Sequence, residues 1–214
     1  INNYQITPGL MQLDGTGVVL GDTAYNAILY TNAQLMPVSG DLSNQPGATL
    51  INQAKLGITA TGVYKNYGQT FNNGEMHVLG RLFVYDGNLW NQNHALLRVG
   101  AGGYLGQVNN IVMDNQGRIV VDPGGQAGLL SFANHAPGLF DNEGQTILGT
   151  PSQSINIDNT GQIINSGTLT VSSPQAVLTN ALEGGFTNFG TLAVRSGSTF
   201  TLQGLQFTSQ GLIQ

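Results

Sequence analysis

The chain has 214 residues, a net charge of −5, and charged side chains at only 8% of positions. Globular domains average about 25% charged residues and nucleic-acid-binding surfaces are basic, so the composition argues against a nucleic-acid partner. Cysteine is absent, which excludes disulfides and thiolate metal sites, and no apolar run approaches the roughly 20 residues of a membrane-spanning helix.

The first 60 residues are the least repetitive part of the chain. Two stretches, Thr23–Thr31 and Gln175–Leu182, are the best candidates for a short helical turn. The stretch Ser39–Leu50 contains a Pro-Gly pair and predicts an exposed loop or a boundary. We therefore predict an N-terminal cap or inter-subunit linking region over residues 1–60 and a β-solenoid over residues 61–214.

Glu75, His77 and Arg81 are the best catalytic candidates in the chain. Glu75 and His77 lie two positions apart and would share one face of a strand. A polysaccharide-cleaving β-helix needs carboxylates clustered on one face, and the whole chain has 11 acidic residues. A surface pair without a catalytic role is the favoured interpretation, so no catalytic site is predicted, and a carbohydrate-active enzyme is the alternative.

Strands that begin at a glycine recur from residue 80 onward. GRLFVYDG, GRIVVDPG, GTLTVSS and GTLAVRSG share the order Gly, polar, apolar, any residue, Val. This period-two alternation predicts short strands that turn every second side chain toward a core. The residues expected to point inward are Leu82, Val84, Ile119, Val121, Leu169, Val171, Leu192 and Val194.

A second motif, apolar-x-Asn-x-Gly-x-apolar, surrounds these strands and predicts the corners of a coil. Glycine accepts positive φ, asparagine is the next most tolerant residue, and stacked asparagine amides can bond one another as a ladder. The predicted corner residues are Asn115, Asn142, Asn159, Asn165, Asn188, Gly117, Gly144, Gly161, Gly167 and Gly190.

Asp-Asn-x-Gly occurs three times and also has a possible calcium interpretation. Asp114, Asp141 and Asp158 would be the ligands. An EF-type loop needs further oxygen ligands at alternating positions and a distant Glu, which these stretches lack. A metal site is therefore not predicted, and neither is a cofactor.

The intervals between the glycine-launched strands are unequal but fit coils of roughly 20–25 residues, the period of a solenoid. We predict an all-β chain folded as a right-handed parallel β-helix, with an N-terminal cap or linking region. An antiparallel β-sandwich is the alternative fold, because alternation alone does not fix strand direction.

The C-terminal stretch FTLQGLQFTSQGLIQ keeps its strand pattern and carries no charge. Edge strands of monomers are usually protected by charges or proline, so this edge predicts pairing with another chain. The uncharged N-terminal INNYQITPGLMQL could add the partner strand, which predicts head-to-tail association of identical subunits. A fragment of a longer solenoid is the alternative.

The runs NTGQIINSGTLTV and NFGTLAVRSGSTFTLQG resemble the degenerate repeats of bacterial surface β-solenoids, such as filamentous haemagglutinins and autotransporter passengers, over roughly Phe71–Gly211. The resemblance implies an extracellular or cell-surface protein with a structural or adhesive role, but no site residues. Its partners would be identical subunits or a host or environmental carbohydrate or protein surface. A carbohydrate-binding or carbohydrate-cleaving β-helix and a phage fibre or spike fragment are the alternatives.

Overall fold

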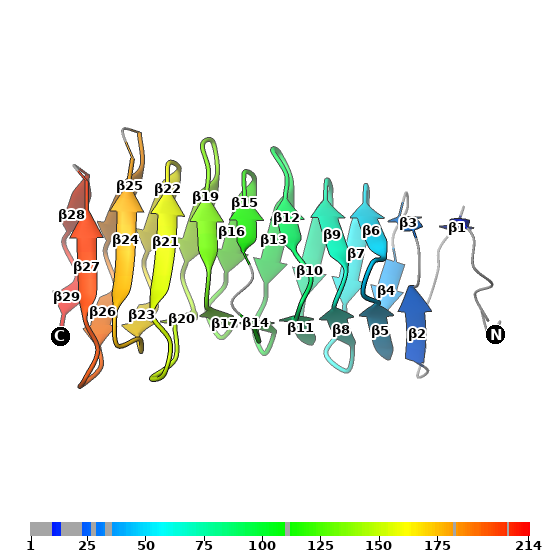
Figure 1. Ribbon diagram of the computed structural model, residues 1–214, viewed down its shortest axis with the longest axis horizontal. Helices are drawn as coiled ribbons and strands as arrows, with labels where there is room; N and C mark the ends of the chain where they lie inside the picture. The colour runs from blue at the N-terminus through cyan, green and yellow to red at the C-terminus, as the bar shows by residue number, and fades with distance from the viewer. Residues whose placement is uncertain are drawn as a thin grey trace.

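The computed structural model describes residues 10–13, 23–26, 29–32, 36–109, 112–181, 183–204 and 206–214. Every secondary-structure element assigned in these residues is a β-strand. None of the described residues forms a helix that could cross a membrane. The strands are short and pass in turn through three sheets, which builds an elongated stack of coils (Figure 1).

Within the described residues, successive coils add one strand at a time to each sheet, and sheet B has nine strands where sheets A and C have ten. Sheet A contains β1 (Leu10–Leu13), β3 (Leu29–Asn32), β6 (Thr49–Asn52), β9 (Gln69–Asn72), β12 (Leu89–Asn91), β15 (Met113–Asn115), β18 (Phe132–Asn134), β21 (Ile155–Asn159), β24 (Ala176–Asn180) and β27 (Phe200–Gln203). Sheet B contains β4 (Met36–Val38), β7 (Lys55–Ile58), β10 (Glu75–Val78), β13 (Leu96–Val99), β16 (Arg118–Val121), β19 (Leu139–Asn142), β22 (Gln162–Asn165), β25 (Gly185–Asn188) and β28 (Phe207–Ser209). Sheet C contains β2 (Thr23–Asn26), β5 (Asp41–Asn44), β8 (Val63–Asn66), β11 (Arg81–Val84), β14 (Tyr104–Gln107), β17 (Gln126–Leu129), β20 (Gln145–Leu148), β23 (Thr168–Val171), β26 (Thr191–Val194) and β29 (Leu212–Ile213).

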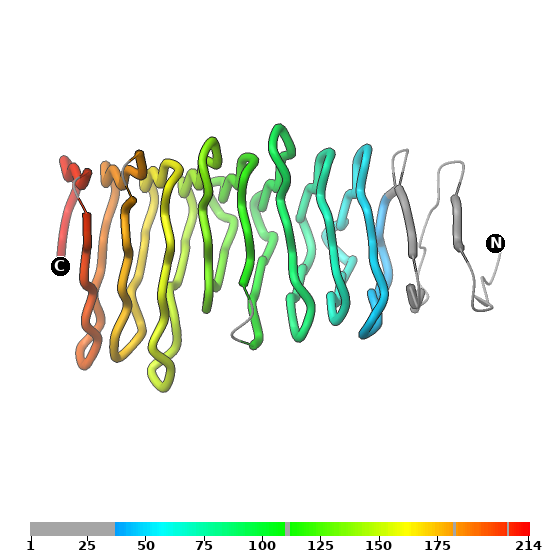
Figure 2. The backbone as a smooth tube through the Cα atoms, turned by 45° about the horizontal axis from the view of Figure 1, so that its top comes forward, coloured from blue at the N-terminus to red at the C-terminus, as the bar shows by residue number. Residues whose placement is uncertain are grey.

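Neighbouring strands in all three sheets are parallel, so the predicted β-solenoid is confirmed and the antiparallel sandwich is wrong. The residues that pair between coils are separated by as few as 18 positions, for Val63 and Arg81, and by as many as 25, for Phe132 and Ile157. The spread explains why the glycine intervals in the sequence are unequal, because extra residues enter the corners while the strands keep their pairing. Figure 2 shows that the corners differ in size from coil to coil. The right-handed sense of the coil stays a prediction.

Alternate side chains of each strand fill the space enclosed by the three sheets. All eight residues expected to point inward belong to this core, and Val194, near the last coil, is the one that is only partly buried. The other seven are at most 3% exposed. An apolar void of about 10 Å³ in the core is no larger than one water molecule and offers no polar partner, so this void is not a ligand site.

The structure corrects three local expectations. The described residues of Thr23–Thr31 belong to β2 and β3, and β24 occupies most of Gln175–Leu182, so no described residue of either stretch is helical. Ser39–Leu50 contains β5 and the start of β6, with a turn only between them. Hydrogen bonding to the adjacent coils determines these conformations. The local sequence propensity for helix or turn contains no information about that pairing.

Strands on both sides of residue 60 share the same sheets. Leu50 on β6 pairs with Thr70 on β9, and Leu42 on β5 pairs with Tyr64 on β8. Solenoid coils are therefore present before residue 61. The cap or linking role of the first segment stays a prediction, and residues 1–9 and 14–22 lie outside the described part of the chain.

Candidate functional site

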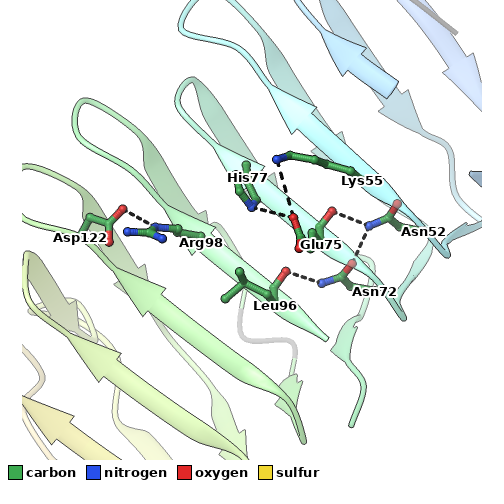
Figure 3. Close-up of polar contacts among 8 residues, drawn as sticks. All are labelled: Asn52, Lys55, Asn72, Glu75, His77, Leu96, Arg98 and Asp122. Atoms are coloured by element: carbon green, nitrogen blue, oxygen red, sulfur yellow. Dashed lines mark hydrogen bonds and ion pairs between the residues drawn. The ribbon is translucent and has the colours of Figure 1, made fainter. Parts of the chain in front are cut away.

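The outward face of sheet B carries a row of charged side chains, which we call the charged band. Its members are Lys55, Glu75, His77, Arg98, Arg118, Asp122 and Asp141. They come from five successive coils, because parallel stacking places equivalent positions of neighbouring coils side by side. Figure 3 shows the first part of the band, where these side chains face one another across the strands.

Glu75 and His77 project from the same face of β10, with Oε2 of Glu75 3.3 Å from Nε2 of His77 (Figure 3). Lys55, the register partner of Glu75 on the preceding coil, places its Nζ 3.7 Å from the same Oε2. Arg81 lies on β11 in sheet C and does not join them. The predicted trio is therefore divided, and Lys55 is a member that the sequence search missed. Its position one coil length before Glu75 was the feature that could have revealed it.

Burial and neighbouring cations govern the charge of His77. Desolvation of the ring lowers the pKa of His77 first, Lys55 and Arg98 lower it further, and Glu75 opposes the shift. Nε2 of His77 is buried and makes no hydrogen bond to the described residues, although Oε2 of Glu75 lies 3.3 Å away. The imidazole is therefore held in its neutral form at neutral pH.

The rest of the charged band consists of closed ion pairs. Arg98 Nε donates to Asp122 Oδ2 at 2.7 Å, and Arg118 Nη2 donates to Asp141 Oδ2 at 2.8 Å. Each arginine is about half exposed, at 50% and 53%, so each pair contributes at most about 1 kcal/mol to stability. The hydrogen bond and charge of Asp122 raise the pKa of Arg98, which keeps this pair ionised.

The band therefore resembles a set of links between coils more than an acid–base site. Glycoside cleavage requires two carboxylates placed on opposite sides of one bond. The cluster of Lys55, Glu75 and His77 contains one carboxylate, and an arginine binds each of Asp122 and Asp141. A neutral imidazole beside a paired carboxylate can accept a proton, but no second catalytic group faces it within this cluster.

The calcium candidates lie apart from one another. Asp114 and Asp158 are on β15 and β21 of sheet A, separated by Ala133 on the intervening strand, while Asp141 is on sheet B. Within the residues that the structure describes, no three His, Cys, Asp or Glu side chains converge as metal ligands. Parallel stacking gives each aspartate its own outward position, so the repeated motif does not assemble a loop of ligands.

Asp114 is nevertheless an unusual acid. Its Oδ1 is buried without a hydrogen-bond partner, and its Oδ2 lies 3.6 Å from Nε2 of His135. Desolvation raises the pKa of Asp114, and the charge of His135 only partly opposes the shift. Burial of this single acid beside a histidine therefore costs electrostatic free energy when the carboxylate is ionised.

The predicted corner asparagines form hydrogen-bonded ladders. In sheet A, an asparagine ends each strand from β6 to β24, and each one before Asn180 donates from Nδ2 to Oδ1 of the next along the stack at 2.7–2.8 Å. We call this set the sheet A ladder: Asn52, Asn72, Asn91, Asn115, Asn134, Asn159 and Asn180. Shorter ladders join Asn142, Asn165 and Asn188 in sheet B and Asn44 and Asn66 in sheet C.

Each ladder asparagine also bonds the backbone. Asn115 accepts from Asn91 at 2.8 Å, donates to Asn134 at 2.7 Å, and donates its second amide hydrogen to the carbonyl of Leu139 at 3.2 Å. Leu139 is the first residue of β19, the sheet B strand of the next coil. One side chain therefore fixes both the spacing between coils and the direction in which the chain leaves the corner.

Of the two reasons expected for asparagine at these corners, the amide ladder is confirmed and the tolerance of positive φ is wrong. Asn115, Asn159 and Asn188 are the last residues of β15, β21 and β25, with their side chains buried, and are not turn residues. Among the described non-glycine residues only His94 has positive φ, at 67°. Amide bonding, rather than tolerance of positive φ, places asparagine here.

The corner glycines also serve a purpose different from the expected one. They do not have positive φ, but an added Cβ would lie 2.2 Å from the Gly144 carbonyl oxygen at Gly167 and 2.1 Å from the Gly167 oxygen at Gly190. Gly117, Gly144 and Gly161 meet carbonyl oxygens in the same way, at 2.2–2.4 Å. Close approach of successive coils therefore excludes a side chain.

A shallow pocket of about 280 Å³ lies at the corner between sheets A and B. Its lining residues are Asn93, His94, Ala95, Gln116, Gly117, Arg118, Pro137 and Leu139. The lining contains no carboxylate, and Arg118 is bound to Asp141. The pocket therefore offers neither a metal ligand set nor an acid–base pair.

Comparison with protein-family models, with curated protein sequences and with solved structures finds no match for this chain. The structure by itself shows the broader class, a parallel β-solenoid of three stacked sheets.

Proposed function

We propose that this chain is a structural segment of an extracellular or cell-surface protein, in which a rigid stack of coils extends as a rod. The sheet A ladder is the observation that carries the proposal. From Asn52 to Asn180, one buried asparagine side chain in each coil is hydrogen-bonded to the asparagine of a neighbouring coil. The resemblance of the repeats to bacterial surface solenoids supports the location outside the cell.

The distribution of charge supports a structural role over an enzymatic one. Four of the described acids, Asp41, Glu75, Asp122 and Asp141, are engaged by cations from neighbouring coils. Such pairs link coils along the stack, whereas catalysis by carboxylates needs acids that are free to act on a substrate.

The partner we propose is another solenoid coil from a second copy of the chain. The strands β27, β28 and β29 each have an unpaired edge among the described strands, and Phe207, Leu212 and Ile213 beside it are 37%, 55% and 53% exposed. Free strand edges and apolar side chains together favour addition of strands. If the natural chain continues past residue 214, its own next coil occupies this edge.

The test is sedimentation of the purified chain over a range of concentrations. We expect the wild type to form longer species as the concentration rises and Ile213→Lys to stay small, because a charge on the edge opposes pairing. Val112→Lys is the matched control, since Val112 is 48% exposed and lies away from that edge. A wild type that stays monomeric, or assembly that Ile213→Lys leaves unchanged, would contradict the partner proposal.

The location has its own test. A tagged chain expressed in the source organism should be removed by protease added to intact cells. A tag that stays protected until the cells are lysed would contradict an extracellular position.

A further inference from the structure

Four aromatic side chains form a continuous row on the outward side of sheet C, which we call the aromatic row. Tyr67 stacks on Tyr85 with ring centroids 4.6 Å apart and planes 12° apart. Phe83 joins Tyr85 at 6.0 Å and Tyr104 at 5.7 Å. All four rings are half-buried, so the row connects three successive coils and leaves ring surface open to solvent.

Two glycines let the Tyr104 ring lie down against the sheet. An added Cβ on Gly106 would be 2.5 Å from the ring carbon Cε1 of Tyr104, and one on Gly128 would be 3.1 Å from its hydroxyl. Gly106 is the register partner of Phe83, and Gly128 follows it on the next coil. The ring therefore covers bare backbone and turns its other face outward as a flat surface.

The aromatic row also has an available cation. Arg81 is exposed, points to the same side of β11 as Phe83, and is the register partner of Tyr104. Its guanidinium makes no hydrogen bond or ion pair with the residues that the structure describes. Lys55, Lys65, Arg98 and Arg118, by contrast, each pair with a carboxylate, and Arg195 donates to Ser172.

These features suit one chemical class of ligand. Flat aromatic faces bind the apolar face of a sugar ring, phenolic hydroxyls can bond its hydroxyl groups, and a free guanidinium binds a carboxylate or sulfate bidentately. Single-stranded nucleic acid also stacks on aromatic rings, but it carries a phosphate at every nucleotide and needs a basic groove along its backbone. Among the described residues the aromatic row offers one unpaired cation, Arg81, which suits a ligand recognised through a single acidic group.

We propose that the aromatic row, Tyr67, Phe83, Tyr85 and Tyr104, together with Arg81, is a binding surface for an acidic oligosaccharide. Successive sugar rings lie along the aromatic row, and Arg81 binds the acidic group of one of them. The site needs no second copy of the chain, so it stands independently of the assembly proposed above. It also gives a role to Arg81, which the charged band leaves out.

Calorimetric titration of the full chain tests the site. The probes are a galacturonic acid trisaccharide, a sulfated heparin oligosaccharide, neutral cellotriose and polyglutamate. We expect binding of at least one acidic saccharide, much weaker binding of cellotriose, and none of polyglutamate. The two acidic probes distinguish a carboxylate from a sulfate as the recognised group.

Variants assign the binding to the row. We expect Tyr104→Ala and Arg81→Gln each to weaken binding about tenfold or more, as loss of a central contact typically does. Gly106→Ala should weaken it as well, because the added methyl displaces the Tyr104 ring while every aromatic side chain remains. Phe189→Ala and Arg195→Gln are the controls, since Phe189 is 51% exposed elsewhere on the surface and Arg195 carries the same charge as Arg81.

Several results would overturn the proposal. One is the absence of binding to both acidic saccharides, and another is unchanged affinity in Arg81→Gln and Tyr104→Ala. Equal affinity for cellotriose would overturn the choice of an acidic ligand, and equal affinity for polyglutamate would show attraction by charge alone. Arg81→Gln and Tyr104→Ala change exposed or half-exposed side chains, so they keep the test decisive if Gly106→Ala does not fold.

Discussion

Asn134 donates an amide hydrogen to Oδ1 of Asn159 across 2.7 Å, although the two residues are 25 positions apart in the chain. Both side chains are buried, and Nδ2 of Asn159 in turn donates to Oδ1 of Asn180 at 2.8 Å. A buried amide is costly unless its donors and acceptor are satisfied, so each member of the sheet A ladder depends on its neighbours. The ladder thus connects the last residue of a short strand to the equivalent residue in the next coil, and so stabilises the stacking of the coils.

Asn159→Ala should lower the free energy of unfolding by about 1–3 kcal/mol, because it removes the donor to the buried Oδ1 of Asn180 and the acceptor 2.7 Å from Nδ2 of Asn134. Chemical denaturation measures the change. Asn93→Ala is the control, since Asn93 is exposed in a corner, and it should have little effect. Equal stability of the Asn159→Ala variant and the wild type would remove the ladder from the account of stability.

Gly167→Ala should destabilise the fold by at least about 1–3 kcal/mol, because its Cβ would lie 2.2 Å from the Gly144 carbonyl oxygen and force two coils apart. Gly57→Ala is the matched control: nothing lies within 4 Å of a Cβ at Gly57, so thermal unfolding should be nearly unchanged. Similar melting temperatures for the two variants would show that close stacking does not require glycine at Gly167.

Asp114→Asn should stabilise the protein at neutral pH. Burial raises the pKa of Asp114 above its ordinary 3.8, so this group's favourable contribution is present below pH 3.8 and is lost as the pH rises through the folded-state pKa. The gain from Asp114→Asn should therefore be present at pH 7 and disappear near pH 3.5. Asp158→Asn, at an exposed position of the same sheet, should show no such difference in denaturation.

His77→Gln should reduce the loss of stability on mild acidification. Burial and the nearby cations lower the pKa of His77 below its ordinary 6.5, so its contribution is present above pH 6.5 and is lost as the pH falls through the folded-state pKa. Denaturation at pH 7.5 and pH 5 should show a smaller difference for His77→Gln than for the wild type. His94→Asn keeps a residue that accepts the positive φ of that corner, and an equal reduction in this variant would contradict the specific role of His77.

The strand pattern could be predicted from the sequence because the alternation of apolar and polar residues depends only on neighbouring positions in the chain. Leu82 and Val84, or Leu169 and Val171, alternate with outward residues, and that alternation alone identifies the core. The parallel direction followed from the repeat, since glycine and asparagine return at each coil. The helical turns were wrong because a four-residue strand and a sharp corner can mimic helical spacing when the neighbouring coil is not visible.

The candidate sites were harder to predict because they depend on coil length. Lys55 meets Glu75 only because 20 positions separate them, while a coil elsewhere spans 18 or 25. Tyr67 meets Tyr85 in the same way, through stacking and not through sequence proximity. The sequence therefore identified Glu75 and His77 as a pair, but it assigned Arg81 to the wrong neighbours.

Fibre diffraction from the concentrated, aligned protein tests the central claim most directly. Coils that stack along the long axis, within and between copies, predict a reflection near 4.8 Å on the meridian, the spacing of neighbouring parallel strands. A reflection of that spacing on the equator, or protein that forms no extended species at any concentration, would contradict the account of this chain as a stacking structural rod.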